Sequence, residues 1–215
     1  ARSKLEQETQ SVKEEINRII PIIKKIRKKF PDLIISVDTV RSSVATEALL
    51  CGADIINDVS GGYGDKKMIE VLKQHRCPYI LTHNIVKSIN NDKLKSENTI
   101  KDIIRFFSKR IKELKTHGVY DIIIDPGFGF SKSIEQNFEL IKYFEMLHVL
   151  HTPIMVGISR KSMIYNMLET KPDESINGTS IMHSFLISRN ASIFRVHDVK
   201  EMKEVKMLWE ASYYY

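Results

Sequence analysis

Short apolar runs alternate with amphipathic segments along most of the chain. Between the runs, apolar residues recur at helical spacing, as in Lys13–Lys29 and Ser43–Leu50. Strands that alternate with helices are typical of βαβ units and a parallel sheet. The pattern therefore predicts an α/β protein with six strands, at Leu33–Val37, Asp54–Ile56, Tyr79–Leu81, Ile122–Ile124, Ile154–Val156 and Ile193–Val196.

One residue interrupts the first helical segment. Pro21 lies among its isoleucines, and proline lacks the N–H that a helix interior needs. We expect Pro21 to start or kink a turn rather than to lie in a regular helix.

Each predicted strand ends in polar or glycine-containing residues. In parallel α/β folds ligands bind at the carboxyl ends of the strands. A closed (β/α)8 TIM barrel needs eight strands, two more than we count, and the chain begins with a helix. We therefore expect residues 1–215 to form a single barrel domain that is incomplete at its N-terminus, with the first two strands absent.

Composition narrows the class of protein. Apolar residues make up 42% and charged residues 28% of the chain, as in ordinary globular proteins. No apolar run approaches the roughly 20 residues of a membrane span, and the start lacks a secretory signal. Cys51 and Cys77 are too few for a disulfide framework. We expect a cytoplasmic protein with two reduced thiols.

The net charge of +6 raises the question of nucleic acid binding. The lysines are scattered along amphipathic helices among glutamates, without a basic stripe interleaved with aromatic residues. A solvated helix surface is therefore the favoured interpretation, no nucleic acid partner is predicted, and small anionic substrates suit the charge.

Three polar side chains follow three of the predicted strands. Asp38, Asn57 and Asp125 share a strand face with the residue two before them, which places them at the rim of a barrel. A buried carboxylate is costly unless it is paired. Each residue alone is explained by capping the next helix. Together, with Lys161 and Arg195 as further rim candidates, they favour a ligand site.

Two further segments combine cations with strand ends. Gly157 to Ser162 opens a helix, where free N–H groups and Gly157 would admit an anion; alternatively Ser159 or Ser162 caps the helix. Arg195 and His197, two apart on one strand face, suit a phosphate group; alternatively Arg195 pairs with Asp38 or Asp125.

The remaining candidates are weaker. Phe130 ends a glycine-rich turn, where stacking on a flat ring and simple packing are equally good accounts. We interpret His83-Asn84 as a hydrogen-bonded structural pair. The other histidines lack metal-ligand spacing.

The motifs, taken in order, resemble the dihydropteroate synthase family from about Leu33 to Leu208. D-P-G-F-G-F, S-R-K-S and R-V-H-D in this order are the specific signals. The full series is S-V-D-T (Ser36–Thr39), I-N-D (Ile56–Asp58), T-H-N (Thr82–Asn84), D-P-G-F-G-F (Asp125–Phe130), G-I-S-R-K-S (Gly157–Ser162), N-G-T (Asn177–Thr179) and R-V-H-D-V (Arg195–Val199).

The resemblance implies a folate-pathway transferase that joins dihydropterin pyrophosphate to p-aminobenzoate. It implies that Lys161, Arg195 and His197 act in catalysis, the last two on the pyrophosphate. Ser162 would bind the carboxylate of p-aminobenzoate. The implied pterin-binding residues are Asp38, Asn57, Thr82, Asp125, Phe130, Gly157, Lys161 and Arg195.

The family also implies Mg²⁺ on the pyrophosphate and a homodimer formed through the later helices. Its metal-holding asparagine lies in a first strand that this sequence lacks, so no metal ligand is predicted in the chain. The Ser/Thr-x-Arg-Pro loop is missing too, and Ile85–Asp92 lacks the usual Gly-x-Pro character. A pterin-binding methyltransferase domain and a non-catalytic barrel subunit are the alternatives.

Overall fold

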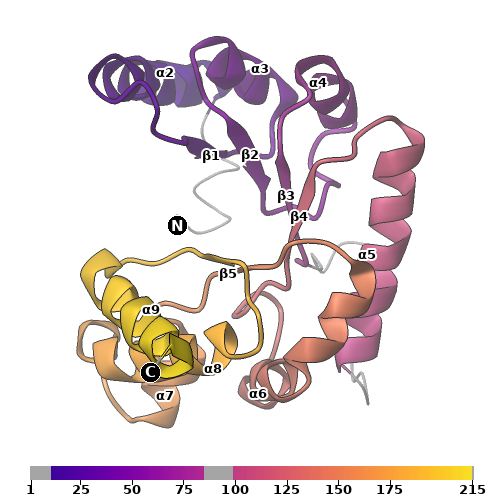
Figure 1. The fold of residues 1–215 in the computed structure, drawn as a ribbon. Coiled ribbons are helices and arrows are strands. Elements are labelled where there is room, and N and C mark those ends of the chain that lie inside the picture. The colour runs from indigo at the N-terminus through magenta and orange to yellow at the C-terminus, as the bar shows by residue number, and fades with distance from the viewer. Residues whose placement is uncertain (1–10, 85–98, 215) are drawn as a thin grey trace. The chain divides into compact units, whose positions relative to one another are not determined.

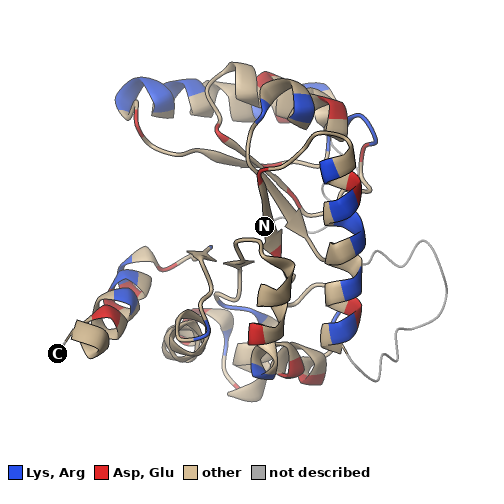
Figure 2. Ribbon diagram, turned by 45° about the vertical axis from the view of Figure 1, so that its right-hand side comes forward, with Lys and Arg blue, Asp and Glu red and all other residues tan. Residues whose placement is uncertain are grey.

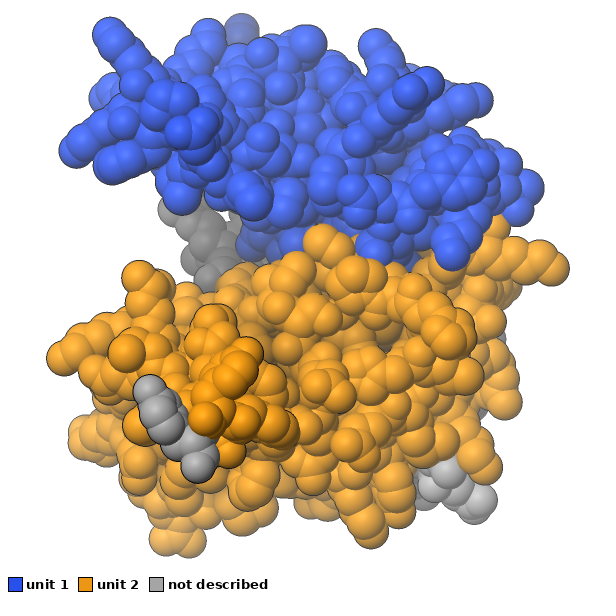
Figure 3. All heavy atoms as spheres, in the orientation of Figure 1, with its two compact units in different colours: residues 1–81, 113–122 blue, residues 82–112, 123–215 orange. Residues whose placement is uncertain are grey.

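The computed structural model describes residues 11–84 and 99–214. By its contacts the chain divides into two compact units (Figure 3). Unit 1 comprises residues 1–81 and 113–122, and unit 2 comprises residues 82–112 and 123–215. The six predicted strands are all present (Figure 1): β1 (Ser36–Asp38), β2 (Ile55–Asp58), β3 (Tyr79–Thr82), β4 (Ile122–Asp125), β5 (Met155–Val156) and β6 (Ile193–Phe194).

Unit 1 is built on the parallel strands β1, β2 and β3, hydrogen-bonded in that order. The register pairs Asp38 with Asn57, so the two polar strand ends are neighbours. The side chains of Ile56 and Leu81 are fully buried in its core. Its helices are α2 (Val12–Lys29), α3 (Ser42–Leu50) and α4 (Met68–His75).

The predicted interruption at Pro21 is wrong, since α2 is one helix from Val12 to Lys29 with Pro21 inside it. Ser11 and Glu14 form a capping box that fixes the start of the helix. The helix packs on α3, with Ile23 buried. Interior proline costs a helix roughly 3 kcal/mol, so tertiary packing outweighs this local preference.

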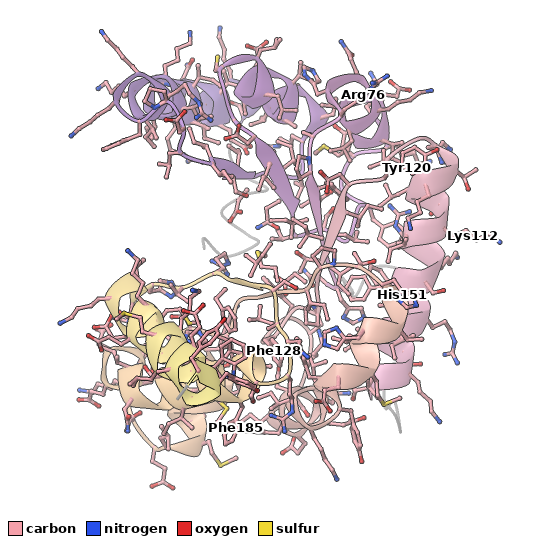
Figure 4. All side chains as sticks on the ribbon, in the orientation of Figure 1. Arg76, Lys112, Tyr120, Phe128, His151 and Phe185 are labelled. Carbon is pink, nitrogen blue, oxygen red and sulfur yellow. The ribbon has the colours of Figure 1, made fainter. Side chains whose placement is uncertain are left out.

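Unit 2 continues with parallel strands. Ile124 at the centre of β4 bridges Ile154, and β5 pairs with β6 through Met155 and Ile193. Phe128, 1% exposed, lies in the interior of this unit (Figure 4). Its helical elements are α6 (Ile134–Lys142), η1 (Phe144–Leu150), α7 (Ser162–Met167), η2 (Pro172–Glu174), α8 (Ile176–Ile187) and α9 (Val199–Tyr214).

Helix α5 (Thr99–Thr116) carries the mixed charge that the sequence indicated. Lys101, Arg105 and Lys109 are exposed on it, and basic segments alternate with acidic ones along its length (Figure 2). Such interleaving is typical of a solvated helix face. Within the described parts of the chain, the helices are too short or too polar to span a bilayer.

Candidate functional site

A buried carboxylate lies at the end of β4. Asp125 is only 5% exposed, and its Oδ1 accepts a hydrogen bond from the backbone N–H of Gly127 at 2.8 Å. Burial raises the pKa of Asp125, while the Gly127 N–H and the positive charges of Arg195, Lys161 and Lys132 oppose the rise. Unit 2 therefore holds a desolvated carboxylate in a cationic neighbourhood.

The loop after Asp125 depends on glycine. Gly127 has φ +72°, and a Cβ there would lie 2.2 Å from the carbonyl oxygen of His83, which leaves no room for any side chain. The backbone N–H of Gly129 donates to Oδ1 of Asn137 at 2.8 Å. Local sequence thus dictates a tight turn that presents Phe130 beside the carboxylate's strand end.

Lys161 meets this loop from the start of α7. Its ammonium lies 4.5 Å from the centre of the Phe130 ring, a cation–π contact. Burial and the charge of Arg195 lower the pKa of Lys161, and Asp125 partly compensates. This contact with a cation is additional to the two accounts of Phe130, ligand stacking and simple packing, that the sequence offered.

The alternative in which Ser159 or Ser162 caps the helix is wrong. Lys161 is the N-cap of α7, which has no side-chain cap, and Ser162 is its exposed first residue. Helix α7 has six residues, so its dipole contributes little to anion binding. Ser159 instead bonds His197: its Oγ accepts from the backbone N–H of His197 at 3.2 Å and lies 3.1 Å from Nδ1.

Arg195 and His197 lie beyond the strand that was expected to hold them. Strand β6 ends at Phe194, so their common strand face is a wrong prediction, although the Arg195 N–H still donates to the Val156 oxygen at 2.9 Å. The Arg195 guanidinium packs on Gly157, where a Cβ would lie 3.3 Å from Nε. Burial, then Arg195, lowers the pKa of His197.

Arg160 lies in the segment Gly157 to Ser162, but it was not singled out as a site residue from the sequence. Its guanidinium donates to both carboxylate oxygens of Asp198, at 2.9 and 2.5 Å, and to Asp173 at 2.6 Å. Its backbone has φ +51°, which is unfavourable for a non-glycine residue. The paired R and D of S-R-K-S and R-V-H-D were the available signal. This fork joins the loop that carries Lys161 to the segment that carries His197.

In unit 1, Asn57 Nδ2 donates to Oδ1 of Asp38 at 2.6 Å. Asn57 is 3% exposed, and its Oδ1 finds no hydrogen-bond partner within the described part of the chain. The capping explanation fails at all three strand ends, because the N-caps of α3, α4 and α6 are Arg41, Lys67 and Ser133.

The structure also bears on the weaker candidates. Thr82 is fully buried, with an Oγ1 that lacks a partner among the described residues. His83 and Asn84 each bond the segment after β4, through Lys132 at 3.0 Å and Ser131 at 3.4 Å. Lys132 was not among the site residues predicted from the sequence. Its only sequence signal was its position two residues after the glycine-rich turn. In the described ranges 11–84 and 99–214, His, Cys, Asp and Glu form no group of three that would hold a metal ion.

Comparisons with known proteins agree on one family. Residues 1–197 match the family described as pterin binding enzyme. The chain is 39% identical to dihydropteroate synthase of Synechocystis sp. over 92% of its length and 70% of that protein. It is 36% identical to the Streptococcus pyogenes enzyme of the same name, over 91% of its length and 72% of that protein.

Solved structures are similar to the chain across nearly its whole length. Yersinia pestis DHPS with a pterine-sulfa conjugate superposes with a TM-score of 0.88 at 31% identity, covering 96% of this chain and 78% of that one. Xanthomonas albilineans dihydropteroate synthase in complex with 7,8-dihydropteroate gives 0.87 at 29% identity, covering 95% and 76%. The predicted fold class, the TIM barrel, is confirmed by this similarity.

Proposed function

The chain belongs to the pterin binding enzyme family, and from this premise we infer that it acts as a dihydropteroate synthase in folate biosynthesis. It condenses 6-hydroxymethyl-7,8-dihydropterin pyrophosphate with p-aminobenzoate to give 7,8-dihydropteroate and pyrophosphate. The observation that carries the inference is the buried Asp125 carboxylate among three cations of unit 2. The relatives reported above are synthases, so we do not favour the methyltransferase or non-catalytic alternatives.

We propose that Asp125 binds the amino and ring N–H edge of the pterin. An ionised carboxylate has two oxygens that accept side by side, and a buried one gains most from such donors. The burial of Asp125 supports this role. Lys161 donates to the ring carbonyl, while Thr82, Phe130 and Gly157 form the walls around the ring.

We propose that Arg195 and His197 bind the pyrophosphate leaving group. The C–O bond to pyrophosphate breaks and both electrons depart with the pyrophosphate. The arylamine nitrogen then forms the new C–N bond and loses its proton to water. No strong base is required because the arylamine is neutral at pH 7. The two side chains stabilise the developing negative charge, and Ser162 binds the carboxylate of p-aminobenzoate.

For unit 1 we propose that Asp38 and Asn57 also bind the pterin. The support within this unit is the orientation of the Asn57 amide, which donates to Asp38 and leaves its buried Oδ1 to accept from a ligand.

Four predictions of the sequence remain proposals. These are the single barrel domain over residues 1–215, the homodimer, the cytoplasmic location and the Mg²⁺ ion on the pyrophosphate. The described residues offer no three-ligand carboxylate or imidazole set, so no step of the reaction is assigned to the metal.

Calorimetry with dihydropterin pyrophosphate, with and without p-aminobenzoate, tests the function directly. Asp125→Asn should weaken dihydropterin binding by about 2 kcal/mol or more, because one carboxylate acceptor becomes a donor. Asp121→Asn is the matched control, since Asp121 is exposed next to the opposite end of the same strand. Unchanged affinity in Asp125→Asn would remove the pocket assignment.

A further inference from the structure

Lys132 is half-buried, and its ammonium lies against the glycine-rich loop. Its ammonium is 2.9 Å from the carbonyl oxygen of Gly127, 3.2 Å from that of Phe130 and 3.4 Å from that of His83. It is also 3.0 Å from Nδ1 of His83. One side chain therefore joins the residues that follow β3 to both halves of the loop that follows β4.

The charges at this contact determine the direction of the hydrogen bonds. Burial lowers the pKa of His83 to about 3, so its imidazole is neutral and Nδ1 accepts. Burial also lowers the pKa of Lys132 to about 8, against the attraction of Asp125, so the ammonium is mostly charged at neutral pH. Lys132 is thus the donor to all these partners.

The loop places two carbonyl oxygens within reach of this one donor. Gly127 and Gly129 both have positive φ, and in this turn the oxygens of Gly127 and Phe130 converge on a single point. Buried carbonyl groups without donors are costly. The Gly127 oxygen also accepts from the backbone N–H of Phe130, so Lys132 is its second donor, and Lys132 donates to the Phe130 oxygen as well. Lys132 also adds a positive charge that favours the ionised form of Asp125.

We propose that Lys132 is a positioning residue for pterin binding: it fixes the loop that carries Phe130, and its positive charge adds to those of Arg195 and Lys161 in favouring the ionised carboxylate of Asp125. The inference rests on the proposed pterin-binding role of Asp125. Lys132 itself touches carbonyl groups and an imidazole of the protein, so it acts through Asp125 and the loop rather than on the substrate.

The pH dependence of pterin affinity distinguishes an electrostatic role of Lys132 from a purely structural one. The charged groups that face Asp125 are Lys132, Lys161 and Arg195, and those that face Lys132 are Asp125 and Lys161, with neutral His83 beside it. Pterin affinity falls at low pH as Asp125 takes up a proton. This fall is the acid limb of the curve of affinity against pH. Without the charge of Lys132, the acid limb moves to higher pH.

The experiment is calorimetric titration of the full chain with 6-hydroxymethyl-7,8-dihydropterin at a series of pH values. Lys132→Met removes the charge and the donors, and we expect roughly tenfold weaker binding at pH 7 together with the shifted acid limb. Lys132→Gln retains N–H donors, so it should bind more tightly than Lys132→Met yet show the same shift. Lys109→Met, exposed on α5, is the control and should match the wild type.

The inference is overturned if pterin affinity falls at the same acidic pH in both Lys132 variants as in the wild type. This holds even if the affinity of the variants at pH 7 is lower. Should Lys132→Met not fold, Lys132→Gln alone decides by the same criterion. A wild-type chain that binds no pterin would instead overturn the proposed function, and this inference with it.

Discussion

The ammonium of Lys161 lies over the ring of Phe130, 4.5 Å from its centre. The two residues come from different loops, one after β4 and one after β5, and both are proposed to contact the pterin. Burial lowers the pKa of Lys161, and the negative face of an aromatic ring is a favourable partner for its ammonium. The aromatic face thus keeps a cation at the site before any ligand binds.

Phe130→Leu should therefore weaken pterin binding by about 1 kcal/mol, because it retains the apolar volume but removes the face that holds Lys161. Phe185→Leu is the matched control, since Arg189 lies 5.9 Å from that exposed ring on α8. Calorimetry with the dihydropterin measures both. Equal affinities for the two variants would contradict a role for the Lys161–Phe130 contact.

Lys161→Ala should abolish product formation in a steady-state assay while leaving the circular dichroism spectrum unchanged.

Gly127→Ala should destabilise the protein by more than about 2 kcal/mol, because the added Cβ meets the His83 carbonyl oxygen at 2.2 Å. Gly118→Ala separates the cost of a positive φ from the cost of the clash with a neighbouring atom. Gly118 also has positive φ, +87°, but a Cβ there meets nothing nearer than 3.8 Å. Its cost should be about 1 kcal/mol, from φ alone. Urea denaturation measures both, and equal losses would show that the His83 contact is not tight.

Gly157→Ala should leave the fold intact and weaken pyrophosphate binding. The new Cβ would lie 3.3 Å from Nε and Nη2 of Arg195, so the flexible guanidinium must move by a few tenths of an ångström. Arg195→Ala removes the group that is displaced. In a double-mutant cycle the effect of Gly157→Ala on pyrophosphate affinity should disappear in the Arg195→Ala background. An effect that persists there would mean that Gly157 acts on something other than Arg195.

Asp198→Asn should lower stability and weaken pyrophosphate affinity severalfold, because it breaks the two-pronged ion pair that joins Arg160 to the segment of His197. Asp173→Asn is the matched control on the same guanidinium. The Asp173 side chain is 90% exposed and that of Asp198 is 13% exposed, so water screens the first pair far more. Thermal unfolding and pyrophosphate titration compare the variants. A loss as large in Asp173→Asn would count against the inner pair as the anchor.

Stability should fall as the pH drops below about 6.5, owing to two buried histidines. Burial lowers the pKa of His83 to about 3 and of His183 to about 4, from 6.5. Between these values the unfolded chain binds protons that the folded chain does not, so acid favours unfolding by up to about 1.4 kcal/mol per pH unit and histidine. Urea titrations of His183→Gln between roughly pH 4 and 7 should show a shallower slope than the wild type.

His117→Gln supplies the comparison, because that histidine is exposed. The variant should keep the wild-type dependence on pH. If the pH dependence of stability in His183→Gln equals that of the wild type, the folded protein does not lower the pKa of His183.

The sequence by itself determined the kind and order of the elements. Runs of β-branched residues and helical repeats are local signals, and each of the six strands overlaps its predicted run, although β1 begins later and β6 ends earlier than predicted. The polar residues at strand ends and the glycines of the turn after β4 were equally legible, since each expresses a conformational requirement of a few adjacent residues. The specific motifs also carried the family.

Only the tertiary structure decided which side chains bond one another. Lys132 bonds a histidine 49 positions away, and Arg160 bonds an aspartate 38 positions away. Pairing with β5 ends β6 at Phe194, and packing against α3 keeps α2 intact through Pro21. A cation's role depends on which carbonyl groups and carboxylates surround it after burial. That environment comes from chain segments distant in sequence, so no local pattern contains it.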